Sequence, residues 1–335
     1  FLGCMLILII LCLSLLCSCS CDIEHDPKTF RVLSYNVQNL FDARLDGGEY
    51  PEYQDPKVWN DRSYRMRLET LSKVLLSEKL LSPDVIILQE VEGPRVVEDL
   101  LCLHLGRKGY RWYAVAKGTD AAISVAVISR HPIASSTVHA SAGIRPVLEA
   151  TICTEGGDIS LFALHAKSQI GDGADLRLSL AKVVSRASYE RAGSAVLLCG
   201  DFNEDPSSVW DSAASAPALV DMNHPEATRL QAAGALGLVG DHAALAPGLY
   251  YCPYLDESWK GSAPGSCSWD GLWHRYDQIL ANGKLFDGMG WEYESFSIEN
   301  LPSLCSSDGR PYAWNIRTLQ GVSDHFPVLM TLKRR

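Results

Sequence analysis

Residues 195–206 read AVLLCGDFNEDP, and this stretch guides the interpretation of the whole chain. Residues 196–199 form a short apolar run, which is typical of a buried central strand, and Gly200 ends it. If the extended backbone continues, Asp201 and Asn203 point to the same face at the carboxyl end of the strand. Held side by side, they can orient a water molecule and hydrogen-bond the group that it attacks. The alternative is an Asx turn without chemistry, because Gly-Asp-x-Asn before a proline also favours a turn.

The composition is that of a globular, acidic chain. It has 335 residues, of which 47% are hydrophobic, enough to bury one large core or two modest ones. The formal net charge is −10, and there is no long run of Lys and Arg. Both features argue against a protein that binds nucleic acid mainly by neutralising phosphates. An acidic enzyme acting on phosphates would instead need a metal cation.

The N-terminal segment is interpreted as a targeting signal. The first 21 residues carry no charged side chain, and residues 1–16 are almost entirely apolar. Leu16-Cys17-Ser18-Cys19 resembles a bacterial lipobox, so we expect lipidation of Cys19 and an exported, membrane-anchored or secreted protein. The alternative is an uncleaved membrane anchor, at the short limit for a spanning helix. The resulting division is a signal and lipobox segment at 1–21, a tether at 22–29 and one domain at 30–335.

Six cysteines follow this segment, and their wide spacing shows neither a small disulfide framework nor a CxxC metal site. Cys199 is interpreted as a buried strand residue. A bridge between Cys252 and Cys267 would link two loops.

Hydrophobic patterning predicts an alternation of strands and helices. The expected strands are 30–40, 84–91, 110–116, 123–129, 147–153, 159–163, 196–199, 276–280 and 328–332. The expected helices are 63–79, 96–105 and 177–191. Residues 207–270 show little alternation, so we expect them to run over the surface. Their aromatic residues could pack beneath loops, line a substrate rim or meet a lipid surface; they are Tyr250, Tyr251, Tyr254, Trp259 and Trp269, with Trp273 just beyond.

Eight polar residues share one feature, since each stands at an end of an apolar strand run: Asn36, Glu90, His165, Asp201, Asn203, Asp277, Asp324 and His325. Each alone is best explained as a structural or exposed residue. Together they are types that bind a hard cation and a phosphate group. The sequence has no GxGxxG fingerprint, Walker loop, GxSxG elbow or HExxH helix.

The chain resembles the endonuclease/exonuclease/phosphatase (DNase I-like) superfamily in six segments that occur in order. They are SYNV, LQEV, the strand before His165, GDFN, YDQIL and SDHFPV. The similarity extends over residues 30–332, and it is greatest to secreted or surface-bound bacterial members. It implies an α/β fold in a single domain, a four-layer α/β/β/α sandwich of two mixed sheets.

The resemblance also implies roles for individual residues. Glu90 would hold Mg²⁺, with Asn36 and Asp324 nearby; Mn²⁺ or Ca²⁺ could take its place. Asp201 would position or deprotonate the attacking water, and Asn203 would orient it. His165, together with His325 aligned by Asp277, would donate to phosphate oxygens, and Lys167 and Ser168 would add substrate contacts. In many relatives an acidic residue or an arginine supports the first histidine; here Asp120 is the one candidate for that position.

Three functions follow from this interpretation. The leading hypothesis is a monomeric, Mg²⁺-dependent phosphodiesterase, most simply an endonuclease acting on DNA or RNA at a bacterial envelope. The second is a phosphatase or phospholipase-type hydrolase of inositol phosphates or sphingomyelin, which exposure of Trp259, Trp269 and Trp273 on one rim would favour. The third is a non-catalytic, ligand-binding lipoprotein, which would tolerate loss of some of the eight polar residues.

Overall fold

The computed structural model describes residues 26–335 except 120, 172 and 211–216. The expected signal segment and Cys19 therefore lie outside the described residues, as does Asp120. Within the described part of the chain, no helix has both the length and the apolar character that a bilayer crossing requires.

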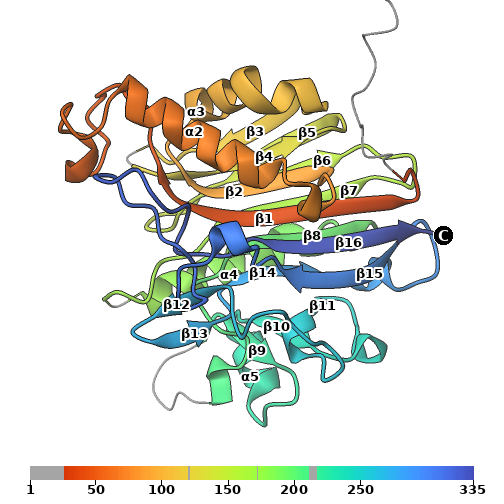
Figure 1. The fold of residues 1–335 in the computed structure, drawn as a ribbon. Helices are drawn as coiled ribbons and strands as arrows, with labels where there is room; N and C mark the ends of the chain where they lie inside the picture. The colour runs from red at the N-terminus through yellow and green to blue at the C-terminus, as the bar shows by residue number, and fades with distance from the viewer. Residues whose placement is uncertain (1–25, 120, 172, 211–216) are drawn as a thin grey trace, which may run out of the picture.

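Two large mixed sheets face one another across the core (Figure 1). The first has the strand order β15-β16-β1-β2-β4-β3. Its strands are β1 (Thr29–Leu40), β2 (Val85–Val91), β3 (Trp112–Ala116), β4 (Ser124–Ser129), β15 (Trp291–Ile298) and β16 (Val328–Arg334). Alternate side chains of these strands point into the space between the sheets and form the core.

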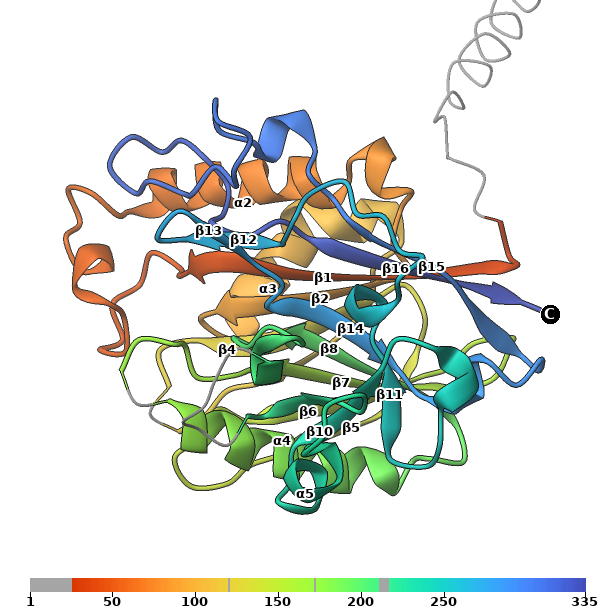
Figure 2. The same ribbon diagram turned by 90° about the horizontal axis from the view of Figure 1, so that it is seen from below.

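The second sheet has the order β5-β6-β7-β8-β14-β11-β10-β9. Its strands are β5 (Ile133–His139), β6 (Val147–Ile152), β7 (Ile159–His165), β8 (Ala195–Asp201), β9 (Leu219–Asp221), β10 (Leu236–Val239), β11 (Leu249–Tyr251) and β14 (Asp277–Ala281). A small hairpin, β12 (Cys267–Trp269) and β13 (Leu272–His274), stands apart from both sheets (Figure 2).

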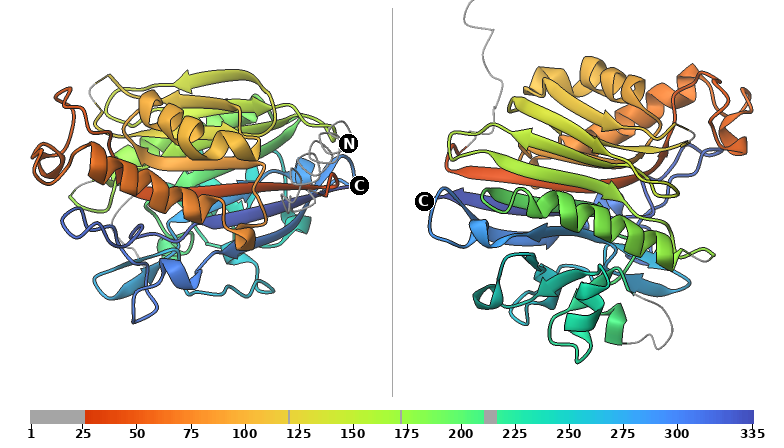
Figure 3. Two further views of the ribbon diagram at one scale, coloured as in Figure 1. Left: turned by 45° about the horizontal axis from the view of Figure 1, so that its top comes forward. Right: turned by 180° about the vertical axis from the view of Figure 1, so that it is seen from behind.

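Helices cover the outer faces (Figure 3). Helices α2 (Asp61–Leu75) and α3 (Pro94–Leu100) lie over the first sheet, and α4 (Ala174–Tyr189) and α5 (Ala227–Ala232) lie over the second. Asn60 caps α2, since its side chain accepts hydrogen bonds from the amides of Arg62 and Ser63. The expected four-layer α/β/β/α sandwich is therefore confirmed.

The register brings functional strand ends to one edge. β7 and β8 are parallel, and His165 lies beside Asp201; β14 runs antiparallel to β8, so Asp277 also lies beside Asp201. In the other sheet β1 and β2 are parallel, with Asn36 beside Gln89, one residue before Glu90. Both sheets therefore present polar residues at the same end of the sandwich.

Two predictions about the chain were wrong. Residues 207–270 do not simply run over the surface, because β9, β10 and β11 extend the second sheet. These strands have only three or four residues each, too few for a hydrophobic period to be recognised. Cys252 and Cys267 are both free thiols; the Cys252 sulfur instead lies 3.7 Å from the side-chain oxygen of Gln278.

Candidate active site

A hydrogen-bonded network joins the two sheets at the edge where their strands end. The side-chain amide of Asn36, in β1, donates to Glu90 Oε1 at 3.0 Å and to Asp201 Oδ2 at 3.1 Å. The backbone amide of Asn39 donates to the other Glu90 oxygen at 3.0 Å. Asn36 thus connects a carboxylate of the first sheet with one of the second.

Glu90 lies in a conformation that non-glycine residues adopt infrequently, with φ of 65°. Burial and, secondarily, the negative charge of Asp324 raise the pKa of its carboxyl group. A nearby cation would stabilise the ionised form of such a buried carboxylate.

Asp201 and Asn203 form the Asx turn that the sequence allowed, and they also face the candidate site. The Asn203 amide donates to Asp201 Oδ1 at 2.8 Å, and its side chain donates to Asp201 Oδ2 at 3.1 Å and to the Ala166 carbonyl at 3.2 Å. Burial raises the pKa of Asp201 to about 7, against the opposing effect of His325. The turn therefore holds the carboxylate that could accept a proton.

His325 pairs with Asp277 across the two sheets. Its Nδ1 lies 2.7 Å from Asp277 Oδ2, while the hydroxyl of Ser323 accepts the His325 backbone amide at 3.1 Å and donates to the Asn36 carbonyl at 2.7 Å. Burial opposes the charged imidazole, but the carboxylates of Asp277, Asp324 and Asp201 together outweigh it, so the pKa of His325 lies well above its usual value. His325 is thus a cationic hydrogen-bond donor.

His165 has the opposite electrostatics. It is buried at the end of β7, with Nε2 3.5 Å from Asp201 Oδ2 and 3.7 Å from Glu90 Oε1. Its pKa is lowered well below the usual value by burial and by the positive charges of Arg145, His325 and Lys167. Its Nδ1 has no hydrogen-bond partner among the described residues.

Asp324 is exposed, and the side chain of Gln38 holds its backbone in place. Gln38 Oε1 accepts the amides of Asp324 at 3.1 Å and Trp314 at 2.6 Å. Arg67 is a fully buried residue near this loop that the sequence did not indicate. Its guanidinium donates to the carbonyls of Val37 and Val322 and lies 4.5 Å from the Trp314 ring centroid. No motif signals such a residue, because its main partners are backbone carbonyls.

The site opens into a cavity of about 420 Å³ between the loops at this edge. We call it the catalytic cavity, because it is the candidate place for the reaction. Six of the eight strand-end residues line it: Glu90, His165, Asp201, Asn203, Asp324 and His325. Asn36 and Asp277 lie behind them, in contact through the hydrogen bonds described above. Ser168 also lines this cavity, whereas Lys167 lines a neighbouring one.

The donor set fits a hard divalent cation. Carboxylate and amide oxygens predominate, and one oxygen of Asp277 is buried without a hydrogen-bond partner among the described residues. Ligand atoms of Asp201, Asp277 and His325 also lie within 4.8 Å of one another, but His325 Nδ1 is paired with Asp277 Oδ2, so this imidazole nitrogen is not free to bind an ion. Such oxygen-rich surroundings suit Mg²⁺ or Mn²⁺ better than zinc, which prefers more nitrogen or sulfur.

The aromatic residues of the 250–273 region mostly pack inside. Tyr250, Tyr251 and Tyr254 are buried, and Trp259 packs edge-on against Tyr254 with a centroid separation of 5.1 Å. Trp273 stacks on Phe326, whereas Trp269 is 64% exposed and lines the cavity. Of the three tryptophans expected to signal a lipid surface, only Trp269 is exposed at the rim.

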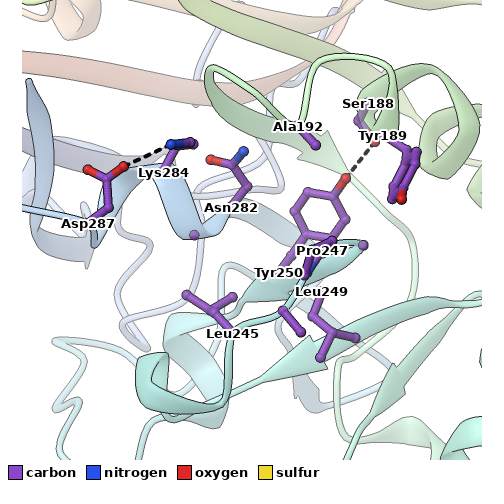
Figure 4. A pocket seen from close by; sticks show the side chains of 13 residues that line it. Ser188, Tyr189, Ala192, Leu245, Pro247, Leu249, Tyr250, Asn282, Lys284 and Asp287 are labelled. Carbon is purple, nitrogen blue, oxygen red and sulfur yellow. Dashed lines mark hydrogen bonds and ion pairs between the residues drawn. The ribbon is translucent and has the colours of Figure 1, made fainter. Parts of the chain in front are cut away.

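A separate cavity of about 240 Å³ lies between the end of α4, β11 and the turn Gly283–Leu285 (Figure 4). It shares no described lining residue with the catalytic cavity. Its polar groups pair with each other: the hydroxyl groups of Tyr250 and Ser188 lie 2.6 Å apart, and Lys284 lies 3.1 Å from Asp287.

The two-sheet sandwich and its edge of carboxylates, amides and imidazoles define a class of hydrolase that acts on phosphate esters with a metal ion. The sequence matches the Endonuclease/Exonuclease/phosphatase family over residues 33–325. The chain therefore belongs to this family and is a metal-dependent phosphoesterase.

Solved structures share the fold at low sequence identity. An endonuclease/exonuclease/phosphatase from Bacteroides vulgatus is 14% identical with a TM-score of 0.56, covering 92% of this chain and 99% of that one. Truncated TDP2 from Caenorhabditis elegans is 14% identical, with a TM-score of 0.54 and the same coverage. D. rerio TDP2 complexed with a single-strand DNA product is 15% identical, with a TM-score of 0.51, covering 91% and 99%. The curated proteins include no significant match.

Proposed function

We propose that this phosphoesterase hydrolyses phosphodiester bonds of nucleic acid in the cavity at the sandwich edge, with Mg²⁺ as its metal ion. The observation that carries the proposal is the convergence of Glu90, Asp201 and the His325–Asp277 pair, from both sheets, on one cavity of about 420 Å³. This combination supplies an acceptor for a water proton and donors for a phosphate group.

Asp201 is the proposed base. Its raised pKa, about 7, suits a group that accepts a proton from water near neutral pH. Asn203 holds the carboxylate through two hydrogen bonds, and its amide group would also orient the water.

The two imidazoles have different proposed roles. Cationic His325, oriented by Asp277, donates to a phosphate oxygen and balances the negative charge that develops on the phosphate. His165 stays neutral, because its pKa is lowered, and donates a hydrogen bond without carrying charge. Ser168, which lines the cavity, adds a further donor.

Glu90, Asn36 and Asp324 are the proposed residues for the metal ion. A bound divalent ion would supply positive charge beside the scissile phosphate. Glu90 is the strongest candidate ligand, since burial and Asp324 both disfavour its negative charge in the absence of a cation. Mn²⁺ or Ca²⁺ are alternative ions.

Nucleic acid is favoured over lipid for two reasons. A protein of the same fold, D. rerio TDP2, is known in complex with a single-strand DNA product. Trp259 and Trp273 pack against Tyr254 and Phe326, so Trp269 alone of these three tryptophans is exposed at the rim, which is little aromatic surface for sphingomyelin at a membrane. Inositol phosphates remain the alternative substrate class.

Export and lipid anchoring at Cys19 are proposed from the sequence of residues 1–21 alone. Metabolic labelling with palmitate, compared between the wild-type protein and Cys19→Ser, tests the anchor. Loss of label in the variant would support it, and equal labelling would contradict it. A monomer is expected and can be checked by light scattering.

A substrate panel tests the reaction. Supercoiled DNA, abasic DNA, single-stranded DNA, RNA, sphingomyelin and inositol phosphates are incubated with Mg²⁺ or with EDTA. We expect turnover of nucleic acid that is lost in EDTA and in His165→Ala but retained in Asp158→Asn, which alters an exposed aspartate in the β6–β7 turn. Turnover in EDTA would overturn the metal assignment, and turnover of lipid alone would overturn the substrate class.

A further inference from the structure

A second, larger cavity adjoins the catalytic one, with a volume of about 860 Å³. Tyr50, Ile123 and Arg145 line both, so the two cavities meet along these side chains. The additional walls come from the β3–β4 loop, the β5–β6 loop and the first half of α4. We call it the lateral cavity; its volume lies within the range of about 300–1,000 Å³ that is usual for ligand sites.

Three cationic side chains line the lateral cavity: Lys117, Arg145 and Lys167. Among the described residues, which leave out Asp120 and Asp172, none of the three forms an ion pair with a carboxylate. Lys117 lies near Glu92 without such a pair. Arg145 donates instead to the Ala166 carbonyl at 2.7 Å, in the segment that follows His165. In a chain with a net charge of −10, this local positive charge requires an explanation.

The rest of the lateral cavity is apolar. Ile123 and Leu180 are buried in its wall, and Ile144, Leu176 and Pro146 add further apolar surface. A free inorganic anion would not use such a wall. A ligand with an anionic group joined to a flat or apolar body would use both the cations and the wall.

We propose that the lateral cavity binds the nucleotide next to the scissile phosphate of a single-stranded nucleic acid. Arg145, Lys117 and Lys167 contact the phosphate of that nucleotide, and its sugar and base lie against the apolar wall. The inference rests on the proposed function, because the strand reaches the lateral cavity from the catalytic site past Arg145. A second phosphate beyond the one that is hydrolysed should therefore raise kcat/KM.

The position of Trp269 agrees with a strand that crosses the site. This exposed indole lines the catalytic cavity, whereas it does not line the lateral one. Aromatic side chains in such positions stack on unpaired bases. A single strand would thus meet an aromatic surface at the catalytic cavity and cationic groups in the lateral cavity.

The test compares two substrates that differ in the second phosphate. One is thymidine 5′-(p-nitrophenyl) phosphate, a diester with a single phosphate, and the other is a short single-stranded oligothymidylate. For Lys117→Gln and Lys167→Gln we expect the ratio of kcat/KM on the oligonucleotide to kcat/KM on the small diester to fall about tenfold. The matched control is Lys108→Gln, an exposed lysine outside both cavities, which should leave the ratio unchanged.

A binding measurement separates this inference from the proposed function. Fluorescence anisotropy of labelled oligothymidylate is recorded with Asp201→Asn, alone and combined with Lys117→Gln, over a range of salt concentrations. We expect Lys117→Gln to weaken binding about tenfold. We also expect it to reduce the slope of log Kd against log salt concentration by about one, the amount for one phosphate contact.

The outcomes are distinct. If the wild-type protein hydrolyses no nucleic acid, the proposed function is wrong. Weaker oligonucleotide binding by the combined variant would still support the lateral site in that case. The wild-type protein could instead hydrolyse both substrates, while the lysine substitutions change neither the ratio of kcat/KM values nor the binding of the oligonucleotide. This result would overturn the lateral site alone. If an inositol polyphosphate, rather than the oligonucleotide, loses turnover in Lys117→Gln, the nucleotide assignment is wrong.

Discussion

Two histidines share the catalytic cavity, and their surroundings move their pKa values in opposite directions. Burial disfavours the charged form of His325, but its partner Asp277, together with the charges of Asp324 and Asp201, outweighs that effect. His165 is buried near Arg145, His325 and Lys167, all of which disfavour its protonated form. One cavity thereby holds a charged and a neutral donor, which residue type alone does not indicate.

The Asp277→Asn variant tests the charged donor. Removal of the carboxylate should lower the pKa of His325, so the imidazolium is lost at a lower pH than in the wild type. We expect kcat to fall by about 10²–10⁴ and the high-pH limb of the activity profile to move to lower pH. Proton NMR of His325 measures the pKa directly, and an unchanged titration would contradict this account.

Glu92 lies just beyond β2, and burial raises its pKa to about 7. Its ordinary value is 4.5, so the folded state binds the proton more tightly than the unfolded state. The resulting stabilisation is fully present below pH 4.5 and is lost as pH rises through about 7. Glu92 therefore weakens the fold at alkaline pH.

The neutral variant Glu92→Gln should be more stable than the wild type at pH 8, by roughly 1 kcal/mol, and similar to it near pH 5. Its amide oxygen can still accept the Asp42 amide that Glu92 accepts at 2.7 Å. Thermal unfolding at both pH values measures the effect. An equal difference at both values would exclude titration of Glu92 as the cause.

At the scale of the element, Gly200 decides how β8 ends. Its φ is 146°, and a Cβ atom there would lie 2.0 Å from the Leu164 carbonyl oxygen of β7. Because that oxygen belongs to a paired strand, neither side can yield easily. The glycine thus allows β7 and β8 to present His165 and Asp201 side by side.

The Gly200→Ala variant should lose at least about 3 kcal/mol of stability or fail to fold. Gly193→Ala is the matched control, since no atom lies within 4 Å of its added Cβ. Urea unfolding of both variants measures the contrast. Comparable stabilities would show that the backbone at Gly200 can relax.

Helix α2 stabilises the site through Arg67, whose guanidinium contacts backbone on both sides of the site. Its bonds to Val37 and Val322 connect the end of β1 with the loop that carries Asp324 and His325. Burial lowers the pKa of Arg67 to about 10, so the side chain remains charged at neutral pH. The helix therefore positions the site without lining its cavity.

Replacement by Arg67→Met should destabilise the protein by about 3–5 kcal/mol, because buried carbonyls lose their donors. Arg65→Met, at an exposed position of the same helix, should change stability by less than about 0.5 kcal/mol. Denaturant unfolding distinguishes the two. A small effect at Arg67 would mean that water replaces its hydrogen bonds.

At the scale of the molecule, the site depends on the packing of both sheets. Asn36 and Glu90 come from the first sheet, whereas His165, Asp201 and Asp277 come from the second. An ion bound by the proposed residues Glu90, Asn36 and Asp324 should stabilise the folded state, because the unfolded chain does not hold these three side chains together.

Saturating Mg²⁺ should therefore raise Tm relative to EDTA, because a hundredfold excess over Kd adds about 2.7 kcal/mol to the free energy of unfolding. The Glu90→Gln variant should lose this response, and Glu155→Gln, which alters an exposed glutamate of the β6–β7 turn, should keep it. Differential scanning calorimetry provides the measurement. A response that persists in Glu90→Gln would remove Glu90 from the proposed metal ligands.

Much of the architecture can be predicted from local patterns. The runs around 30–40, 84–91 and 196–199 are apolar enough to be recognised as strands, and polar residues stand near the end of each. The short strands β9–β11 could not be predicted, because runs of only three or four residues show no period. β5 was also missed; its residues from 134 to 138 are exposed and mostly small.

The sequence by itself determined which residues end the strands, since hydrophobic periodicity and turn chemistry act over a few neighbours along the chain. Only the tertiary structure decided which strand ends meet, because pairing and register join residues as distant as Asn36 and Asp201. The opposite pKa values of the two histidines, the buried Arg67 and the lateral cavity all arise at that level. Each depends on charges and backbone groups that the folded chain brings within a few ångströms of one another.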